Sequence, residues 1–358
     1  MKVVIIGGVA GGATAAARIR RLDEKAEIVV FERSGFISYA NCGLPYYIGG
    51  TIEDEGDLTL QTPESFYKRF RVKMNVRHEV TALHPESKMV TVKNIENGTV
   101  FTETYDKLIL SPGAKPIKPN FEGIDSDKIF TLRTVEDTLK IKKFINEKYP
   151  KSAVVVGGGF IGIEVAENLR ELGIDVTLVE AADQLMAPFD RDMASFIHAE
   201  IRKNSIHLML DTMVEGFADT DCGIDVKLKN TPTLHTDMVV MAIGVAPETT
   251  LAKDTGIELG IKGSIVVNDK METSIPDIYA VGDAVQIKNF VTDKDTLISL
   301  AGPANKQGRI AADNICGGNS HYNGGQGSSV IKIFDMTAAA TGINEKTAKL
   351  LGINADKV

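Results

Sequence analysis

The stretch SAVVVGGGFIGIEVAENLRELGIDVTLVE, residues 152–180, decides the fold. It predicts a buried strand, a glycine-rich turn, a helix and a second strand that ends at Glu180. In the turn, Gly157, Gly159 and Gly162 complete the pattern G-x-G-x-x-G. Glycines let the backbone approach a pyrophosphate, and the start of the helix presents amide donors at the positive end of its dipole. A plain α/β turn without a ligand is the competing interpretation of any single copy.

The chain opens with a second copy of this unit, KVVIIGGVAGGATAAARIRRLDEKAEIVVFER, residues 2–33. A strand leads into a turn that carries Gly7 and Gly12, and an alanine-rich helix leads into a strand that ends at Glu32. Val9 stands in place of the middle glycine, so this copy is less regular. In each copy an acid follows the last glycine by about 20 residues, where it is placed to accept hydrogen bonds from a ribose. Two such units predict two dinucleotide sites in one α/β chain.

The residues around Glu180 bear on the choice of nicotinamide cofactor. A carboxylate at this position favours a free 2′-hydroxyl and repels a 2′-phosphate. The next two residues are Ala181 and Ala182, with no arginine to hold a phosphate. NADH is therefore predicted over NADPH.

Composition restricts the class of protein. The chain has 358 residues, 43% hydrophobic and 25% charged, which is typical of a soluble globular protein of two to three domains. Its net charge of −8 argues against binding to nucleic acid or to an anionic membrane, and no apolar run reaches the length of a membrane span. The three widely spaced cysteines favour a reducing cytoplasm, and the six histidines show no spacing typical of metal ligands, so no metal site is expected.

Two further motifs carry candidate chemistry. SYANCGLPYY, residues 38–47, contains the lone Cys42, which is either a buried structural thiol or a redox centre that lacks a second cysteine. The apolar stretch IYAVGD predicts a strand that ends in Asp283. An acid at the end of a strand binds a polyol such as a ribityl chain, or it caps a helix.

Together these motifs resemble the flavin-dependent pyridine nucleotide–disulfide oxidoreductases over nearly the whole chain. The stretches SYANCGLPYYIGG, QTPESFYKRF, LILSPGAKP and SLAGPANKQGRIAADNI are similar to the single-cysteine branch of that family. This branch includes coenzyme A-disulfide reductases, persulfide reductases, NADH oxidases and NADH peroxidases. The resemblance implies a glutathione reductase-like α/β fold with two Rossmann-like domains. It implies a split FAD-binding domain at 1–112 and 243–322, an NAD(P)H-binding domain at 113–242, and an incomplete C-terminal dimerisation domain at 323–358.

The resemblance also assigns residues to each ligand. The residues that it places at FAD are Gly7, Gly12, Glu32, Arg33, Val80, Ser111, Gly113, Asp283 and Ala301. Those that it places at NADH are Gly157, Gly159, Ile161, Gly162, Glu180 and Gly244, with Glu164 near the nicotinamide. Coenzyme A needs cations for its phosphates. The residues expected to contact it are Thr14, Arg18, Arg21, Ser38, Asn41 and Arg71.

Two positions distinguish the members of the family. Relatives that use a dithiol carry a second cysteine five residues after the first, where this chain has Tyr47, so Cys42 must react with a small thiol or with oxygen. Peroxidases and many oxidases carry a histidine in the first glycine turn, where this chain has Ala10. The absence of that histidine favours the disulfide and persulfide reductases. Cys222, in a turn-like stretch, and Cys316, at a helix end, are expected to be bystanders.

The resemblance implies that a hydride passes from NADH through FAD to a mixed disulfide, Cys42–S–S–CoA. Coenzyme A disulfide, CoA persulfide or polysulfide is then the substrate, coenzyme A is retained covalently in one state, and a lowered pKa is expected for Cys42. The first alternative is an NADH oxidase or peroxidase that reduces O2 or H2O2 through a Cys42 sulfenic acid. The second is a flavoprotein redox sensor or electron-transfer partner without turnover.

The C-terminal region is expected to be short for this family. About 36 residues follow position 323, in which a strand-like run and a short helix are expected, and such a pair cannot bury a core alone. A homodimer is expected for a full-length member, because tyrosines of the partner's interface domain complete the thiol site in the disulfide reductases. We therefore expect this chain to bind FAD and NADH and to turn over disulfide more slowly than a longer one.

Overall fold

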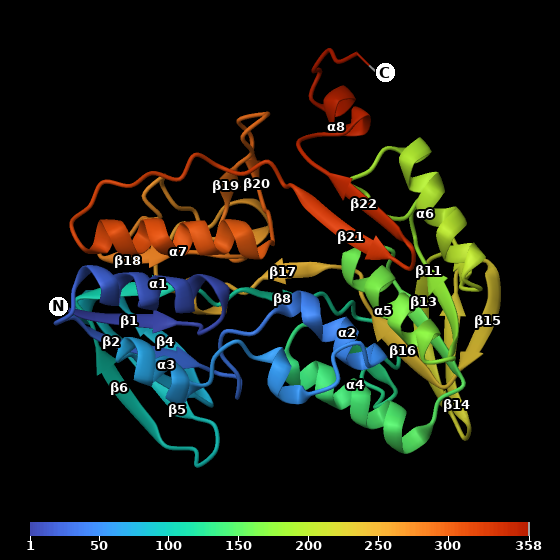
Figure 1. Cartoon of the computed structure of the whole chain (residues 1–358), viewed down its shortest axis with the longest axis horizontal. Coiled ribbons are helices and arrows are strands. Elements are labelled where there is room, and N and C mark those ends of the chain that lie inside the picture. The colour runs from blue at the N-terminus through green and yellow to red at the C-terminus, as the bar shows by residue number, and fades with distance from the viewer. Residues whose placement is uncertain (357–358) are drawn as a thin grey trace. The chain divides into compact units, whose positions relative to one another are not determined.

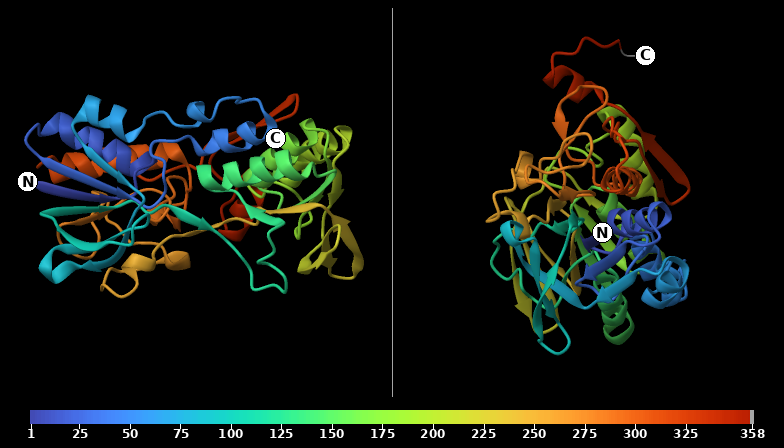
Figure 2. Two further views of the ribbon diagram at one scale, coloured as in Figure 1. Left: turned by 90° about the horizontal axis from the view of Figure 1, so that it is seen from below. Right: turned by 90° about the vertical axis from the view of Figure 1, so that its left-hand side faces the viewer.

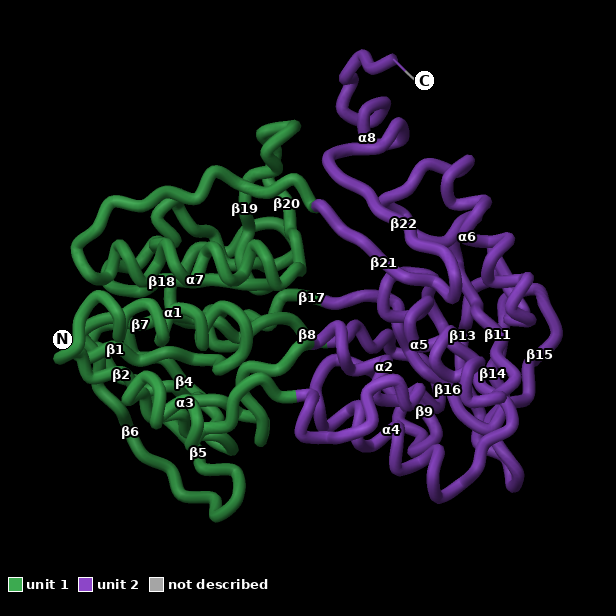
Figure 3. The backbone as a smooth tube through the Cα atoms, viewed as in Figure 1, with its two compact units in different colours: residues 1–40, 59–115, 246–327 green, residues 41–58, 116–245, 328–358 purple. Residues whose placement is uncertain are grey.

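The structure is a computed structural model that describes residues 1–356 and divides into two compact units (Figure 3). Unit 1 comprises residues 1–40, 59–115 and 246–327. Unit 2 comprises residues 41–58, 116–245 and 328 onward. Where the chain passes between the units, β8 (Ala114–Pro116) and β17 (Val245–Pro247) pair as a two-stranded sheet.

Unit 1 is built on a five-stranded parallel sheet in the order β18-β7-β1-β2-β3. Its strands are β1 (Lys2–Ile6), β2 (Glu27–Glu32), β3 (Lys73–Val76), β7 (Lys107–Leu110) and β18 (Ile278–Ala280). Its helices include α1 (Ala10–Leu22), α3 (Pro63–Phe70) and α7 (Ala301–Ile315). The views agree that α1 and α7 lie side by side over this sheet (Figures 1 and 2). Two smaller antiparallel sheets complete the unit: β4 (His78–His84), β5 (Met89–Asn94) and β6 (Val100–Thr104), and β19 (Ile287–Lys288) with β20 (Asp295–Thr296).

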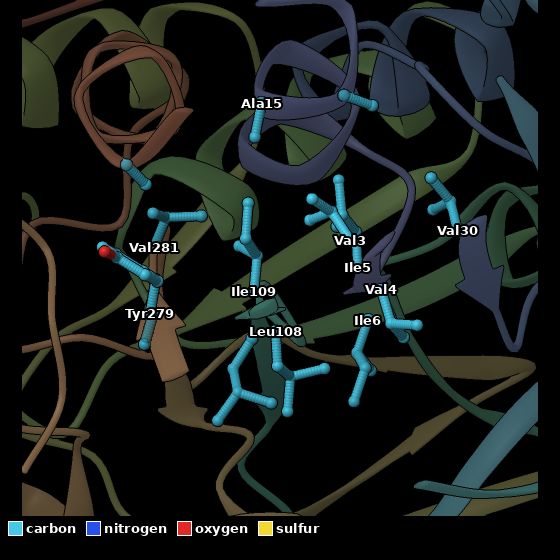
Figure 4. Packing of buried hydrophobic residues seen from close by; sticks show 14 of the residues in the cluster. Val3, Val4, Ile5, Ile6, Ala15, Val30, Leu108, Ile109, Tyr279 and Val281 are labelled. Atoms are coloured by element: carbon cyan, nitrogen blue, oxygen red, sulfur yellow. The ribbon is translucent and has the colours of Figure 1, made fainter. Parts of the chain in front are cut away.

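The core of unit 1 lies on both faces of the parallel sheet. Val3, Val4 and Ile5 of β1 are fully buried, as are Leu108 and Ile109 of β7 (Figure 4). Continuous apolar runs are typical of parallel strands, since helices and loops cover both faces. This packing fixes the carboxyl ends of β1, β2 and β7 at one edge of the sheet.

Unit 2 repeats this plan with a five-stranded parallel sheet in the order β12-β11-β10-β16-β9. Its strands are β9 (Ile129–Thr131), β10 (Ser152–Val156), β11 (Asp175–Val179), β12 (His207–Met209) and β16 (Met238–Met241). Its helices include α2 (Leu44–Gly49), α4 (Val135–Lys148), α5 (Phe160–Glu171), α6 (Arg191–Lys203) and α8 (Glu345–Leu350). A three-stranded antiparallel sheet contains β13 (Val214–Thr220), β14 (Gly223–Leu228) and β15 (Thr231–Thr236), and β21 (Ser329–Ile333) pairs with β22 (Met336–Ala340). None of the helices within residues 1–356 is long and apolar enough to cross a membrane.

The predicted fold class is confirmed, with a Rossmann-like parallel sheet in each unit. Three local details differ from expectation. The strand expected to end at Asp283 ends at Ala280, because a turn through Gly282 follows it at a φ of +85°. Helix α7, which we expected to begin near Pro303–Asn305 in the stretch SLAGPANKQGRIAADNI, begins at Ala301. The C-terminal strand is a hairpin of two strands, and the structure groups this hairpin and residues 41–58 with unit 2.

Candidate functional site

The glycine turn of unit 1 joins β1 to α1 in a space that only glycine fits. Gly7 has a φ of +100°, and a Cβ atom built on it would lie 2.0 Å from the carbonyl oxygen of Ser111. A Cβ atom on Gly12 would lie 1.9 Å from the carbonyl oxygen of Gly7. Three residues predicted at FAD therefore meet where β1 and β7 end.

Glu32 ties this turn to the end of β2. Its Oε2 accepts a hydrogen bond from the backbone amide of Gly8 at 2.8 Å, and its Oε1 accepts one from Ser34 at 2.9 Å. The residue is buried. A carboxylate held in this way presents its remaining acceptor capacity at the carboxyl edge of the sheet.

A cavity of about 280 Å³ opens beside the turn. Its lining contains four residues that the sequence analysis placed at FAD: Gly7, Glu32, Arg33 and Val80. It also contains residues that the sequence analysis missed: His78, Glu79, Thr81, Pro112, Glu248 and Thr250. Pro112 lies in the stretch LILSPGAKP but was not assigned to FAD, and no sequence motif marks the other five, since β4 and the segment after β17 reach the cavity only through the fold.

The remaining residues predicted at FAD lie elsewhere in unit 1. Gly113 follows β7, and Asp283 follows Gly282, whose amide donates to the buried Oε1 of Gln307 at 2.7 Å. Ala301 is the first residue of α7. Helix α7 approaches α1 closely, because a Cβ atom on Gly308 would lie 2.4 Å from the carbonyl oxygen of Gly11.

The glycine turn of unit 2 repeats the geometry of the first. Gly157 has a φ of +109°, and a Cβ atom on Gly162 would lie 1.8 Å from its carbonyl oxygen. Glu180 accepts hydrogen bonds from the amides of Gly158 at 2.6 Å and Ala182 at 2.8 Å. A Cβ atom on Gly159 would have no heavy atom of the described residues within 4 Å, so this turn is open to an approaching ligand.

The other residues predicted at NADH lie near this turn in the chain or across the sheet. Ile161 and Glu164 lie on α5, the helix that the turn opens. Gly244 follows β16, and its carbonyl oxygen accepts from the amide of Ile117 at 3.0 Å. Strand β16 pairs with β10, which leads into the turn, so both segments end at the same edge of the sheet.

Cys42 lies in a short 3-10 turn, Asn41–Gly43, that leads directly into α2 of unit 2. The residue is exposed, and the amide of Asn41 fixes the turn by donating to the carbonyl oxygen of Arg133 at 2.9 Å. Helix α2 packs against α5. The thiol therefore belongs to the same unit as the second glycine turn.

The electrostatics around Cys42 differ from expectation. Partial burial raises the pKa of its thiol, and the negative charge of Glu164 raises it further, while a backbone hydrogen bond lowers it. We expected a lowered pKa because a thiolate is the reactive form. The groups that act on Cys42 in this unit are a carboxylate and apolar surroundings rather than cations, which explains the opposite direction.

Glu164 and Tyr46 are two ionisable side chains that interact with the thiol of Cys42. Burial and the charge of Glu167 raise the pKa of Glu164 to about 7, so it exchanges a proton near neutral pH. Burial, followed by the charge of Glu164, raises the pKa of Tyr46 to about 12, so the phenol stays protonated. Tyr46 was missed by the sequence analysis, although it lies four residues after Cys42, one turn along the chain.

Glu167 connects α5 to the C-terminal hairpin of unit 2. Its side chain is 1% exposed, and its Oε1 accepts from the ammonium of Lys332 at 3.0 Å and from the amide of Phe334 at 2.9 Å. Its Oε2 is buried and has no hydrogen-bond partner among residues 1–356. Residues 332–334 thus sit on the helix that carries Glu164.

The predicted substrate residues of unit 1 lie on three elements. Thr14 donates to Asn305 at 2.8 Å, and Arg18 pairs with Asp313 at 2.7 Å, so both join α1 to α7. The guanidinium groups of Arg21 and Arg71 lie over the rings of Phe70 at 5.7 Å and Tyr67 at 5.6 Å. Ser38 has a φ of +48° and donates its amide to Gly8 at 3.0 Å, whereas Asn41 belongs to unit 2.

Two glycine turns, each closed by a buried or half-buried acid on its own parallel sheet, and the exposed thiol of Cys42 define a redox protein that binds two dinucleotides. The chain belongs to the pyridine nucleotide-disulphide oxidoreductases, whose family model matches residues 1–308. Members of this family use FAD together with a nicotinamide cofactor. The predicted family and its two cofactors are thereby confirmed.

Two individual proteins are similar to this chain over nearly its whole length. Coenzyme A disulfide reductase of Staphylococcus aureus is 38% identical over 349 residues, which is 97% of this chain and 78% of the relative. The crystal structure of reduced Bacillus anthracis CoADR-RHD is 50% identical with a TM-score of 0.96. The match covers 99% of this chain and 63% of that one, so this chain spans less than two thirds of its length.

Two further solved structures are those of proteins named for other activities. A NAD-dependent persulfide reductase from A. fulgidus is 36% identical with a TM-score of 0.94, over 98% of this chain and 66% of that one. A water-forming NADH oxidase from Lactobacillus brevis, bound to NADH, is 33% identical with a TM-score of 0.95. That match covers 100% of this chain and 79% of the oxidase.

Proposed function

We propose that this chain is an NADH-dependent disulfide reductase that acts on coenzyme A disulfide or on CoA persulfide or polysulfide. Cys42 is the thiol that exchanges with the substrate. The observation that carries this proposal is the exposed position of Cys42 on the turn before α2, with all three cysteines of the chain free. A lone thiol takes its partner sulfur from the substrate. The similarity to the coenzyme A disulfide reductase of Staphylococcus aureus supports the same substrate class.

FAD fits unit 1 at the turn after β1. Gly7 and Gly12 let the backbone of the turn approach a pyrophosphate closely. Glu32 lines the cavity and follows the last glycine by about 20 residues, the spacing at which this motif places an acid on the ribose. Arg33 and Val80 line the same cavity. When bound, FAD accepts a hydride from the nicotinamide cofactor and supplies the electron pair that reduces sulfur.

NADH is assigned to the turn of unit 2. Gly159 leaves the space for the pyrophosphate, and Glu180 accepts hydrogen bonds from a ribose that carries no 2′-phosphate. Glu180 already accepts two backbone amides, and a carboxylate has capacity for about four hydrogen bonds. The predicted preference for NADH over NADPH therefore depends on the carboxylate of Glu180.

The residues around Cys42 control its protonation. The thiolate attacks one sulfur of the disulfide, a Cys42–S–S–R bond forms, and the other half leaves as a thiolate that takes up a proton. Glu164 in its acid form carries no charge to oppose the Cys42 thiolate during attack, and it holds a proton near neutral pH that the leaving thiolate takes up afterwards, which leaves Glu164 ionised. Arg18, Arg21 and Arg71 are the cations assigned to the phosphates of coenzyme A, and Arg18 shares its charge with Asp313.

The second candidate function is an NADH oxidase. The similarity to the water-forming NADH oxidase of Lactobacillus brevis favours it, whereas Ala10 in place of a histidine disfavours it. In that reaction oxygen, not a thiol or a disulfide, is the acceptor, and Cys42 cycles through a sulfenic acid.

The homodimer and the boundaries of the FAD and NADH domains remain predictions. Sedimentation of the purified chain tests whether it forms a homodimer.

Steady-state NADH oxidation with coenzyme A disulfide, CoA persulfide or oxygen as the sole acceptor separates these functions. We expect turnover with a coenzyme A substrate that Cys42→Ser abolishes, while NADH still reduces the flavin of that variant. Cys316→Ser is the control and keeps wild-type turnover. Non-reducing mass spectrometry should find coenzyme A on Cys42 that dithiothreitol releases. Turnover with oxygen alone would establish the oxidase, and a single round without turnover would establish a sensor or electron-transfer protein.

A further inference from the structure

A second group of reactive side chains lies on the three-stranded sheet of unit 2. Cys222 sits in the turn between β13 and β14, and its Sγ lies 3.6 Å from Nε2 of His235 on β15. Nδ1 of His235 lies 2.8 Å from Oδ1 of Asp225 on β14. Thiol, imidazole and carboxylate are thus arranged in series on a surface that the activity of Cys42 does not use.

The strand register produces this arrangement. Asp225 and His235 are direct partners across the antiparallel pair β14–β15, and Thr220 pairs with Gly223, which leaves Cys222 in the tight turn. A Cβ atom on Gly223 would lie 2.9 Å from Nε2 of His235. Glycine at this position therefore leaves the room that the imidazole needs to reach the sulfur.

The three roles match those of an activated nucleophile. In the tautomer of His235 that carries its proton on Nδ1, that N–H donates to Asp225, and Nε2 is then an acceptor that faces the thiol. Nε2 can then take the proton of Cys222 as sulfur attacks. Cys222 and His235 are both exposed, so a small molecule reaches the sulfur from solvent.

We propose that Cys222 is a thiol-exchange site that forms a mixed disulfide with small disulfides. In the step, His235 takes the proton of Cys222 as the sulfur attacks RSSR. The Cys222–S–S–R bond forms, the S–S bond of RSSR breaks, and the departing RS⁻ takes up the proton from His235. The disulfide is the oxidant, and no NADH is consumed, so this site goes beyond the proposed function of Cys42. Asp221 and Asp225 lie on or beside the same turn and disfavour anionic disulfides such as those of coenzyme A, whereas the charge of Asp219 is paired with Lys128 at 2.8 Å. The site therefore takes neutral or cationic disulfides, and Cys222 is not the bystander that its sequence context suggested.

The test uses the full flavin-loaded chain without NADH and the neutral probe 2-hydroxyethyl disulfide. Peptide mass spectrometry follows the initial rate of mixed-disulfide formation at Cys222. Cys316 is the internal reference in each sample, because burial followed by the charges of Asp23 and Asp313 raises its pKa. We expect His235→Gln to slow the reaction of Cys222 by about tenfold or more, since a positioned base contributes at least that much. Asp225→Asn should slow it about threefold or more by releasing the imidazole.

The matched control is His207→Gln, which removes another exposed histidine of unit 2. It should leave the rates at Cys222 and Cys316 unchanged. An unfolded variant is recognised because Cys316 then reacts faster, and in that case Asp225→Asn decides the question. The proposal is overturned if Cys222 of the wild type reacts no faster than Cys316, or if a folded His235→Gln or Asp225→Asn variant keeps the wild-type rate.

Discussion

The ammonium of Lys332 lies 3.0 Å from Oε1 of Glu167, a carboxylate that is 1% exposed in α5. The residues come from segments 165 positions apart in the chain, so their pairing attaches the β21–β22 hairpin to the helix behind the thiol. Glu167 also contributes to the raised pKa of Glu164, the carboxyl group whose charge raises the pKa of Cys42.

Lys332→Met should destabilise the chain by about 1–2 kcal/mol, because removing one partner leaves a buried carboxylate less compensated. The amide of Phe334 still donates to Glu167, which limits the loss. Urea unfolding at pH 7 measures the change, and limited proteolysis should cut the hairpin of the variant first. Lys349→Met is the control, since the exposed pair of Lys349 and Glu345 is worth less than about 0.5 kcal/mol. Equal losses in both variants would show that the buried position of Glu167 adds nothing.

Changing Gly159 or Gly162 of the second glycine turn to alanine should impair different properties, NADH binding for Gly159 and stability for Gly162. Gly159→Ala meets no protein atom within 4 Å and keeps a φ of −85°, so we expect a stability loss below about 1 kcal/mol. The added methyl group occupies the space for the pyrophosphate, and the KM for NADH should rise about tenfold.

Gly162→Ala places its Cβ atom 1.8 Å from the carbonyl oxygen of Gly157 and should cost about 2–3 kcal/mol. Thermal unfolding and NADH titration of the flavin-loaded variants separate the two effects. If Gly159→Ala binds NADH as tightly as the wild type, the pyrophosphate does not lie at this turn.

Glu180→Gln should relax the choice of nicotinamide cofactor. The amide oxygen of glutamine still accepts from the turn, but the charge that repels a 2′-phosphate is gone. We expect kcat/KM for NADPH to rise about tenfold and that for NADH to fall severalfold. Glu215→Gln, an exposed acid on β13, is the control and should change neither value. An unchanged preference would mean that discrimination rests on other residues.

The sequence predicts those parts of the molecule whose geometry is set within one β–turn–α–β unit. Gly8 with Glu32 and Gly158 with Glu180 each lie within a single unit, so their hydrogen bonds follow from the motif. The lining of the cavity by β4 and the attachment of Lys332 to Glu167 depend on which distant segments pack together. The pairing of Asp225 with His235 depends on strand register, which short polar strands specify weakly. Composition and spacing carry no signal for such contacts.

Glu164→Gln should make Cys42 more reactive above pH 7. The ionised carboxylate raises the pKa of the thiol, and neutral glutamine removes that charge while keeping the shape of the side chain. We expect alkylation of Cys42 by iodoacetamide at pH 8 to be about twofold to fivefold faster in the variant. Glu171→Gln, exposed on the same helix, should leave the rate unchanged.

The same substitution should alter the pH dependence of stability. The pKa of Glu164 rises from 4.5 to about 7 on folding, so the folded state holds the proton more tightly than the unfolded state. The resulting stabilisation is present below pH 4.5 and is lost as the pH rises towards 7. Glutamine mimics the protonated acid at every pH, so the stability advantage of Glu164→Gln over the wild type should grow from about 1 kcal/mol at pH 5 to about 3 kcal/mol at pH 8.

Urea unfolding of the flavin-loaded chain between pH 5 and pH 8, without NADH, measures this difference. Glu171→Gln is again the control, because an exposed carboxylate gives no such trend. A constant difference between Glu164→Gln and the wild type across this range would mean that Glu164 is ionised throughout. The carboxyl group would then be unable to hold the proton assigned to it beside Cys42, and the leaving thiolate would have to take its proton from solvent.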